Sequence, residues 1–302
     1  MGNNNSLTDQ IRQTAAAVSV NEPMSKHTTF GVGGPAELFV RVSNIDQLRG
    51  VLSILAGARV PVLVFGRGSN LLVRDKGIKG AVIRLSGDLE TISVEGSRVS
   101  CGAGAGLPKL INRCYVRGLS GLEELAGIPS TVGGAVAMNA GSFGSSIGDR
   151  VSKVSAVSYD GTEHSFDHLQ CGFDYRTSVF LSNKMIICRV QFDLEKTDPQ
   201  KIKAKIDRVL LKKAAAQPLK EASAGCVFKN PKGQSAGELI EKAGLKGLSA
   251  GGARVSELHA NYIVNSKGAT AADVICLMEK VQKTVEEKFS VRLEPEIRVV
   301  GD

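Results

Sequence analysis

The sequence predicts a protein of mixed helix and strand content that is divided into two domains. Its 302 residues correspond to about two domains of ~150 residues each. From residue 30 onward, short apolar runs alternate with turns and with segments of helical spacing, as in α/β structure. A basic helical stretch over 198–216 ends at Gln217-Pro218, and this proline marks the expected domain boundary. A smaller module follows it.

Strands and helices alternate in the part of the chain before Pro218. Residues 1–20 have the character of a helix or a tail. Mostly apolar runs predict strands at 36–42, 60–65, 81–85, 98–101, 151–159, 164–166 and 185–194. Apolar residues at helical spacing predict helices at 46–56, 107–118 and 198–216.

The part after Pro218 predicts fewer elements. They are an extended run at 226–228, a helix at 235–243, strands at 262–265 and 293–300, and a long helix at 271–289. The long helix is the clearest, because Thr270 can cap its N-terminus and its apolar residues share one face. Those apolar residues include Leu277, Val281, Val285 and Phe289.

The composition indicates a folded protein without a membrane span. Hydrophobic residues make up 42% and charged residues 23%, which allows a substantial core and argues against disorder. No apolar run approaches the ~18 residues of a membrane-spanning helix. Residues 1–5 lack the apolar segment of a secretory signal, and no basic cluster follows Met1-Gly2 to support a lipid anchor. We expect a cytoplasmic protein with no membrane partner.

The cysteines indicate a reducing compartment. Six are scattered along the chain, none has CxxC spacing, and none lies with histidines at the spacing of zinc ligands. We therefore expect no metal site, and we expect every cysteine except one to be a buried, inert hydrophobic residue. The exception, Cys226, is treated below.

The charge suggests an anionic partner. The formal net charge is +8 and the isoelectric point is about 9.2, which first raises nucleic-acid binding. The charge is spread along the chain, aromatic residues make up only 5%, and tryptophan is absent, so stacking platforms are missing. An anionic small molecule explains a diffuse positive field equally well, and we expect no nucleic-acid partner.

The chain has 34 glycines, and the loops in which they cluster are its most informative local feature. The cluster at 102–106 lacks the third glycine of a dinucleotide-binding fingerprint, because Leu107 stands at that position, and we interpret it as a turn. The loop at 66–72 follows a strand and combines glycines with Arg67, Ser69 and Asn70. Its N–H groups can cradle a pyrophosphate, with an ordinary turn as the alternative.

The segment 127–141 is the second candidate for ligand binding. It consists mostly of small residues, so a large planar ligand can lie on bare backbone while serine, threonine and asparagine form hydrogen bonds. Packing alone would not require so long a run of small residues. We interpret this segment as part of a binding site.

Five phrases of the sequence, taken together, resemble a known family. They lie in this order at 66–72, 127–141, 174–178, 224–231 and 293–296. The chain is similar to UDP-N-acetylenolpyruvoylglucosamine reductase (UDP-N-acetylmuramate dehydrogenase), the flavoenzyme of bacterial cell-wall precursor synthesis. Each phrase is modest alone, but the series is specific, and the resemblance covers essentially all of the chain after residue 24.

The resemblance implies the fold class and the domains. The expected class is α+β, with an FAD-binding fold of the vanillyl-alcohol-oxidase type in two subdomains, followed by a smaller α+β substrate-binding domain. We expect an N-terminal helix or tail over 1–24 and the FAD-binding domain over 25–217, split near 90. The substrate-binding domain follows over 218–302, with a C-terminal strand that carries Glu296.

The resemblance also implies the reaction. NADPH reduces FAD, and flavin N5 then passes hydride to C3 of the enolpyruvyl ether, so that C2 must be protonated. Arg176 matches a position that holds the substrate carboxylate, since its guanidinium keeps its charge. Glu296 matches a glutamate near that carboxylate, and Cys226 matches the proton donor. On position alone, Arg176 would be an ordinary ion-pair arginine and Glu296 a solvated carboxylate.

Cys226 departs from the usual family pattern, in which a serine donates the proton and a cysteine does so in some members. A thiol with an ordinary pKa near ~8.5 is mostly protonated at neutral pH and is a stronger acid than a hydroxyl. A thiol at this position is, however, sensitive to oxidation. A buried inert cysteine is the alternative, and the family phrase around Cys226 decides against it.

The resemblance implies further ligand contacts. Asn230, His259 and Tyr175 match substrate-binding positions, and Lys212, Lys213, Lys242 and Lys246 are open candidates for the diphosphate. Because His27, the nearest histidine, precedes the glycine loops, we expect FAD to be bound non-covalently. The residues expected to bind FAD are Gly66, Arg67, Gly68, Ser69, Asn70, Leu71, Gly127, Ile128, Pro129, Thr131, Gly133, Gly134, Asn139, Ala140 and Gly141.

Two alternatives and one subtype complete the prediction. No tyrosine lies among the 49 residues between Arg176 and Cys226, which resembles the shorter family branch that lacks a tyrosine-bearing loop. An FAD-linked oxidase of the same fold is the enzyme alternative, and a nucleotide-sugar-binding or RNA-binding module is the non-enzyme alternative. Bound flavin excludes the module, and substrate-dependent NADPH oxidation separates reductase from oxidase. We expect no obligatory protein partner.

Overall fold

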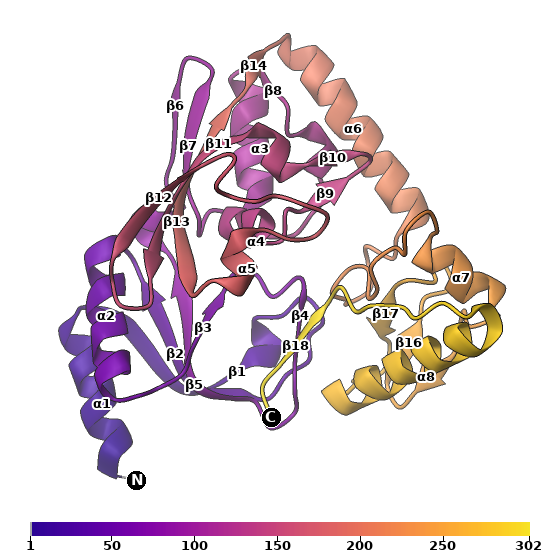
Figure 1. The fold of residues 1–302 in the computed structure, drawn as a ribbon, viewed down its shortest axis with the longest axis horizontal. Coiled ribbons are helices and arrows are strands. Elements are labelled where there is room, and N and C mark those ends of the chain that lie inside the picture. Colours follow the sequence, from indigo (N-terminus) through magenta and orange to yellow (C-terminus); the bar gives the residue numbers. More distant parts are fainter. Residues whose placement is uncertain (1) are drawn as a thin grey trace. The chain divides into compact units, whose positions relative to one another are not determined.

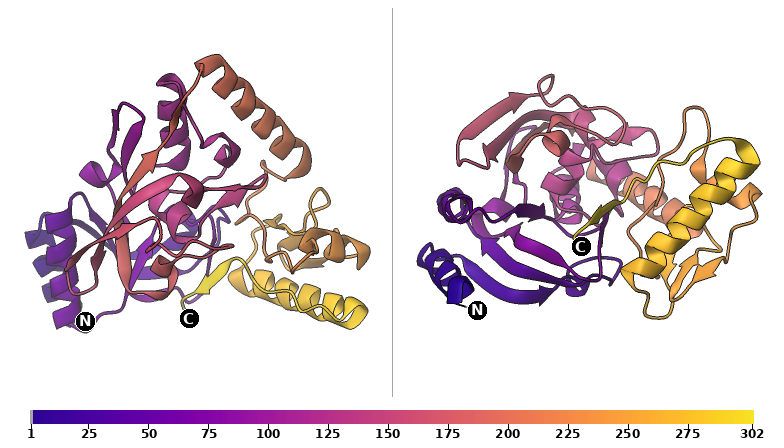
Figure 2. Two further views of the ribbon diagram at one scale, coloured as in Figure 1. Left: turned by 45° about the horizontal axis from the view of Figure 1, so that its top comes forward. Right: turned by 60° about the horizontal axis from the view of Figure 1, so that its bottom comes forward.

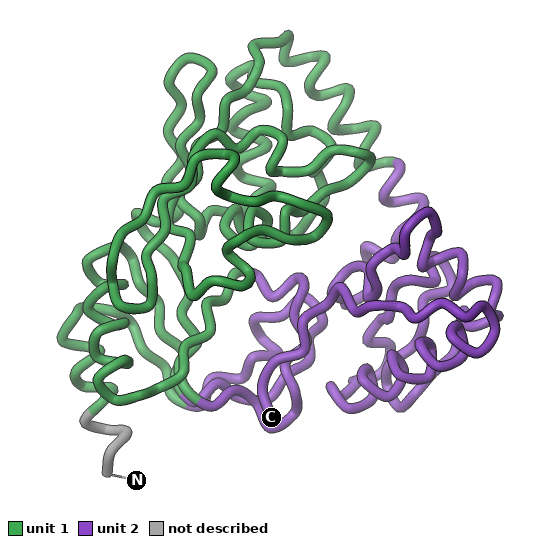
Figure 3. Tube along the Cα trace, in the orientation of Figure 1, with its two compact units in different colours: residues 1–20, 38–66, 80–211 green, residues 21–37, 67–79, 212–302 purple. Residues whose placement is uncertain are grey.

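The computed structural model describes residues 2–302, with side chains from residue 7 onward. The chain forms two compact units (Figure 3), each discontinuous in sequence. Unit 1 contains residues 1–20, 38–66 and 80–211, and unit 2 contains residues 21–37, 67–79 and 212–302. Met1, the first residue of the expected N-terminal helix or tail, lies outside the described residues.

Unit 1 is built around two larger sheets, of four and five strands, in the orders β1-β2-β5-β3 and β12-β11-β13-β7-β6 (Figure 1). In the first sheet β3 pairs with β5 in parallel, whereas the second sheet is antiparallel throughout. Their strands are β1 (Ala17–Pro23), β2 (Pro35–Val42), β3 (Val62–Phe65), β5 (Ile78–Leu85), β6 (Ile92–Glu95), β7 (Arg98–Gly102), β11 (Val151–Ser158), β12 (Glu163–Asp167) and β13 (Met185–Asp193).

Helix α2 (Ile45–Gly57) packs an apolar face against the core of unit 1. Leu48, Val51, Leu52 and Leu55 of α2 are buried in one core with strand residues of both sheets. The helices are α1 (Gly2–Gln13), α2 (Ile45–Gly57), α3 (Leu107–Val116), α4 (Val132–Ala137), α5 (Val179–Ser182) and α6 (Pro199–Ala216). Short strand pairs add β8 (Leu119–Ser120) with β14 (Glu195–Lys196), and β9 (Gly141–Ser142) with β10 (Ser145–Ser146).

Unit 2 has its own core, centred on α8 (Ala271–Phe289), which packs on α7 (Ala236–Lys242) and on a small antiparallel sheet (Figure 2). Thr270 caps α8, since its side chain accepts from the Asp273 N–H at 3.1 Å. The sheet contains β15 (Ser249–Ala250), β16 (Ala253–Val255) and β17 (Ile263–Asn265). A parallel pair joins β4 (Leu71–Val73) to β18 (Arg298–Val300).

The pairing of β4 with β18 explains why unit 2 is discontinuous. Arg298 pairs with Leu71, and Val300 pairs with Val73, so the C-terminal strand lies beside a segment more than 200 residues earlier. A single boundary in the sequence, such as the expected one at 217/218, cannot describe a unit that combines segments from distant parts of the chain. The boundaries at 24 and 217, and the split near 90, remain predictions.

Several sequence expectations differ from the structure. Residues 17–23, expected within a helix or tail, form β1, and the end of the 66–72 loop forms β4. The expected strand at 293–300 is shorter, because only β18 is strand, and Glu296 therefore precedes it. Pro295 has no N–H to give to a ladder, which limits the strand at this point.

The glycine cluster at 102–106 is a turn before α3, as predicted. A Cβ on Gly102 would lie 2.2 Å from the Leu89 carbonyl oxygen, and a Cβ on Gly104 would lie 2.7 Å from that of Leu85. Close packing against backbone therefore explains these two glycines. Among the described residues, no helix has both the length and the hydropathy to cross a membrane.

Candidate functional site

The two glycine-rich segments predicted to bind a cofactor meet in unit 1 at Gly66. A Cβ at Gly66 would lie 2.5 Å from the Thr131 Oγ1, so this close approach requires glycine. Thr131 caps α4, because its hydroxyl accepts from the Gly134 N–H at 3.2 Å. Gly127 has a φ of +83°, a conformation that favours glycine. The loop thus presents backbone with few side chains.

This part of unit 1 fits a flavin nucleotide. The Ser130 side chain is 7% exposed, and its Oγ has no hydrogen-bond partner among the described residues. A buried hydroxyl normally has a partner, so a polar ligand atom would complete this one. Gly133 is explained by packing instead, because a Cβ there would lie 2.8 Å from the Ala103 Cβ. The orphan hydroxyl and the bare backbone are the features that a planar, polar ligand needs.

Asn139, predicted to bind the cofactor, has a supporting role in the structure. The side chain is 7% exposed, its Oδ1 accepts from the Gly148 N–H at 3.0 Å, and its Nδ2 donates to the Asp174 carbonyl at 3.0 Å. The backbone has a φ of +43°, in the left-handed region. Asn139 therefore links the glycine-rich segment to the turn that carries Arg176.

Arg176 lies at the tip of a tight turn in unit 1. Asp174 and Thr177 form an isolated antiparallel bridge around it, and Arg176 itself has a φ of +55°. Such a conformation is costly for a side-chain-bearing residue, by about 1–3 kcal/mol, and is found at functional sites. Its guanidinium donates to the Gly141 carbonyl at 3.1 Å and lies 5.3 Å from the centre of the exposed Tyr175 ring. The guanidinium position is therefore defined.

In unit 2, Asn70 fixes the backbone at Glu296. The Asn70 Nδ2 donates to the Glu296 carbonyl at 3.1 Å, and the Asn70 carbonyl accepts from the Arg298 N–H at 3.0 Å. Asn70 is the last residue before β4, so this contact follows directly from the β4–β18 pairing. The structure thus assigns Asn70 a positioning role that the sequence alone did not indicate.

Cys226 and Glu296 are brought together through Val227. The Val227 carbonyl accepts from the Glu296 N–H at 2.7 Å, and its N–H donates to the Asn261 carbonyl at 2.8 Å. The buried Asn261 side chain also binds both backbone groups of Phe228, accepting at 2.9 Å and donating at 2.8 Å. The segment with Cys226 is therefore held between the segment that ends in Tyr262 and the one that carries Glu296.

The backbone next to Cys226 leaves open space at Gly225. Gly225 has a φ of +80°, and no heavy atom lies within 4 Å of the position its Cβ would take. Cys226 itself is half-buried. Its thiol is thus neither fully enclosed nor on an open surface, as a proton donor to a bound substrate requires.

The other cysteines are different. Burial raises the pKa of Cys101, Cys114 and Cys188 to about 12 and that of Cys171 to about 11, which makes these four thiols inert, as predicted. The same expectation is wrong for Cys276, which lies on the solvent side of α8 and is exposed.

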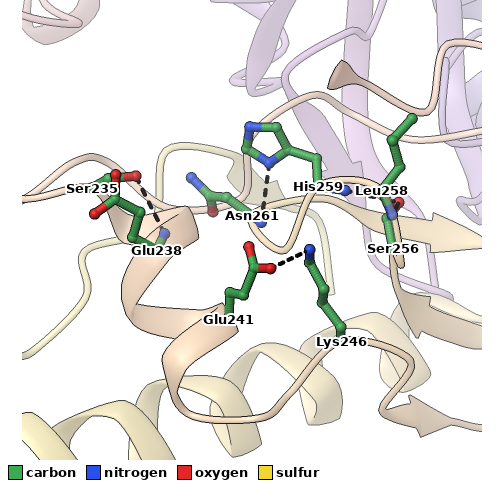
Figure 4. A network of polar contacts seen from close by, with 8 residues as sticks. All are labelled: Ser235, Glu238, Glu241, Lys246, Ser256, Leu258, His259 and Asn261. Atoms are coloured by element: carbon green, nitrogen blue, oxygen red, sulfur yellow. Dashed lines mark hydrogen bonds and ion pairs between the residues drawn. The ribbon is translucent and has the colours of Figure 1, made fainter. Parts of the chain in front are cut away.

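His259, predicted to bind substrate, belongs to a polar network in unit 2 (Figure 4). Its Nδ1 accepts from the Asn261 N–H at 3.2 Å, and its ring meets the Tyr262 ring edge-on, with 4.9 Å between centres. Nearby, the Lys246 Nζ pairs with a Glu241 carboxylate oxygen at 2.6 Å. Lys246 is therefore occupied by a carboxylate of its own chain.

Two other predicted contacts have defined surroundings in unit 2. Asn230 is exposed, and its Oδ1 accepts from the Ala236 N–H at 3.0 Å, at the start of α7. Lys213 is only 3% exposed, and burial lowers its pKa to about 8. Lys213 is therefore the only buried side chain among the four lysines considered for the diphosphate.

The comparisons with known proteins agree with this arrangement. Residues 36–167 match the model of an FAD-binding domain, and residues 217–300 match that of the UDP-N-acetylenolpyruvoylglucosamine reductase C-terminal domain. The combination defines an FAD-dependent oxidoreductase of α+β class, as predicted.

Individual relatives specify the family. UDP-N-acetylenolpyruvoylglucosamine reductase from Caldanaerobacter subterraneus subsp. tengcongensis is 42% identical, with 98% of each chain covered. The enzyme of that name from Bacillus subtilis is 40% identical, with 94% of each chain covered. The crystal structure of the Thermus caldophilus reductase superposes with a TM-score of 0.82 at 39% identity, over 95% of this chain and 99% of that one. The chain belongs to the UDP-N-acetylenolpyruvoylglucosamine reductase family, which acts in peptidoglycan precursor synthesis.

Proposed function

We propose that the protein uses NADPH to reduce UDP-N-acetylglucosamine-enolpyruvate to UDP-N-acetylmuramate. FAD, when bound, supplies the hydride that it receives from NADPH, through N5 to C3 of the enolpyruvyl ether. Addition at C3 leaves negative charge on C2 and on its carboxylate, and C2 must then take up a proton. The protein therefore has to bind a carboxylate, stabilise an enolate and donate a proton.

Arg176 binds the substrate carboxylate in this proposal. A guanidinium keeps its charge at any working pH and matches a carboxylate in geometry. The left-handed backbone of Arg176 and its bond to the Gly141 carbonyl support this role, because they hold the side chain in one position. An arginine that only formed a surface ion pair would need no such backbone.

Cys226 donates the proton to C2. The S–H bond breaks, the new C2–H bond takes the electron pair of the enolate, and the sulfur keeps its own pair as a thiolate. The half-buried position and the space beside Gly225 support this role. Glu296 acts next to it, as a protonated or hydrogen-bonded carboxyl that stabilises the enolate. The observation that carries the proposal is the hydrogen bond from the Glu296 N–H to the carbonyl of Val227, the residue that follows Cys226.

The remaining contacts follow the family pattern. FAD is held non-covalently by backbone and polar groups of the 66–71 and 127–141 segments. The Ser130 hydroxyl, which has no hydrogen-bond partner among the described residues, also binds it. Asn230, His259 and Tyr175 contact the substrate, and the buried Lys213 is the candidate for binding its diphosphate. The chain belongs to the shorter branch, works in the cytoplasm and needs no protein partner.

Two measurements on the purified protein test the proposal. The protein should carry flavin absorbance that is released on denaturation, as expected for non-covalent FAD. NADPH should be oxidised only when UDP-N-acetylglucosamine-enolpyruvate is present. Rapid NADPH oxidation by O2 that is indifferent to this substrate would instead support the oxidase alternative, which family membership disfavours.

Replacement of Arg176 separates the two half-reactions. In Arg176→Ala, flavin reduction by NADPH should proceed at the wild-type rate, whereas reoxidation by substrate should slow by on the order of 10²-fold or more, since a buried charge pair with the carboxylate is lost. Anaerobic stopped-flow absorbance at the flavin band measures both steps. A variant that is slow only in its reaction with NADPH would contradict this role, and Arg189→Ala in β13 provides a matched control.

A further inference from the structure

Tyr262 is a buried tyrosine beside Cys226 that lies outside the phrases resembling the family. Its side chain is 8% exposed, and its backbone forms an isolated antiparallel bridge with Cys226 just before β17. Residues paired in this way carry their side chains on the same face, with Cβ atoms ~4.5–5.5 Å apart. The phenol and the thiol therefore leave the bridge on one side.

The polar neighbours of the phenol are Cys226 and Glu296. Burial raises the pKa of Tyr262, and a charge interaction and a hydrogen bond with the Cys226 side chain raise it further, followed by the charge of Glu296. The phenol is therefore neutral at physiological pH and has an O–H to donate. A buried tyrosine hydroxyl needs a partner, and the sulfur is the one that these contacts provide.

Tyr262 is held in place by two backbone hydrogen bonds and by one contact of its ring. Its backbone N–H donates to the His259 carbonyl at 2.9 Å, and its carbonyl accepts from the Ser256 N–H at 2.8 Å. The His259 ring packs edge-on against it, with an interplanar angle of 63°. Tyr262 thus contacts His259, one of the residues drawn in Figure 4, through both its backbone and its ring.

We propose that Tyr262 is a positioning residue for the proton donor, whose hydroxyl orients the Cys226 thiol and stabilises the thiolate formed by proton transfer. This inference rests on the proposed role of Cys226. The thiol proton goes to C2, the sulfur keeps the electron pair of the S–H bond, and Tyr262 keeps its own proton throughout. A hydrogen bond to an anion is stronger than one to a neutral group, so the contact favours the thiolate and makes Cys226 a stronger acid.

The test replaces Tyr262 with Phe, which removes the hydroxyl and keeps the ring. The rate of Cys226 alkylation by iodoacetamide is followed against pH on the peptide that contains Cys226. The midpoint should move to higher pH by about one unit in Tyr262→Phe, as expected for one lost hydrogen bond to a charged group. Glu296, which also faces the phenol, and His259 behind the ring are unchanged by the substitution.

Cys276 provides an internal control. It is exposed on α8, so it reacts in the same sample, and its midpoint should not move. An unmoved Cys226 midpoint, in a variant with wild-type melting temperature and flavin content, would overturn the inference. A shift of both midpoints would overturn it as well, because it would indicate a change that is not confined to the tyrosine–thiol contact.

The half-reactions test the catalytic consequence. Tyr262→Phe should leave flavin reduction by NADPH unchanged and slow reoxidation by substrate by about tenfold. The same substitution should have no further effect in a Cys226→Ala background, because the hydroxyl acts through the sulfur. If Cys226→Ala alone keeps full turnover, the proposed donor role has failed, whereas the alkylation midpoint still decides whether Tyr262 controls the thiol.

Discussion

His259 is held as a neutral ring with a defined tautomer. Because its Nδ1 accepts from the Asn261 N–H, the proton of the neutral ring lies on Nε2, which is then a hydrogen-bond donor. Burial is the main cause that lowers the pKa of His259, with the charge of Lys246 adding to it, while Glu241 and a backbone hydrogen bond act in the opposite direction. The protein therefore stabilises the neutral form of this side chain.

This shift predicts a dependence of stability on pH. In the unfolded chain the histidine has its usual pKa of 6.5, which is above the value in the folded state, so the unfolded state binds the proton more readily as the pH falls. The free energy of unfolding should decrease below about pH 6.5, and His259→Gln should lose less stability than wild type. Thermal melting between about pH 7.5 and about pH 5.5 measures this. Equal losses in both proteins would contradict it.

The residues that set the geometry of the site were harder to predict than the site residues themselves. Arg176, Cys226 and Glu296 stand in phrases that resemble the family, whereas Asn261 and Tyr262 act through contacts between distant segments. Asn70, which the resemblance assigns to FAD binding, also makes such a distant contact. Asn261 lies 33 residues from its partner Phe228, and Asn70 lies 226 residues from Glu296. Polarity and spacing along the sequence carry no information on such pairings.

At the level of elements, α8 is fixed by caps from two parts of the chain. Thr270 and Asp273 form a reciprocal capping box at its N-terminus. Asp75, just after β4, also accepts from the Ala271 and Ala272 N–H groups at 2.8 and 2.9 Å. The sequence predicted the local cap and the bounds of the helix, but not the distant one.

The distant cap predicts a measurable loss of stability. Asp75→Ala should lower the free energy of unfolding by about 1 kcal/mol, because two N–H groups lose an acceptor and the helix N-terminus loses a negative charge. Urea unfolding, followed by far-ultraviolet circular dichroism, measures the change. Glu279→Ala, at an exposed position of the same helix, is the matched control and should stay within about 0.5 kcal/mol of wild type. Equal effects of both substitutions would contradict the capping role.

Elements with a strong local signal were predicted well. The spacing of apolar residues gave α2, α3, α6 and α8 to within two residues at each end. The closing strand was predicted too long, because apolar residues at 293 and 297 face the core of unit 2 from an irregular segment around Pro295. Burial pattern alone does not separate such a segment from a strand.

At the level of the whole molecule, the positive charge is of the sign that attracts anionic substrates. The net charge is +8, and both NADPH and the UDP-linked substrate are anions. A diffuse positive field raises the rate at which anions reach a protein, and salt screens this effect over about 10 Å at ~0.1 M. Anionic substrates are therefore enough to account for a net positive charge.

Screening gives a direct prediction. The KM for UDP-N-acetylglucosamine-enolpyruvate should rise several-fold between about 50 and about 300 mM NaCl, with kcat changed much less. Steady-state kinetics across this range, with sucrose at matched osmolarity as the control, measures both parameters. A KM that is independent of salt would show that the net charge has no part in binding.

The central claim, that Cys226 protonates C2, is tested most directly by anaerobic stopped-flow on Cys226→Ser and Cys226→Ala. Both variants should be reduced by NADPH at the wild-type rate. Reoxidation by substrate should remain substantial in Cys226→Ser, because a hydroxyl can still donate, and should slow by on the order of 10²-fold or more in Cys226→Ala. Wild-type reoxidation in Cys226→Ala would contradict the account.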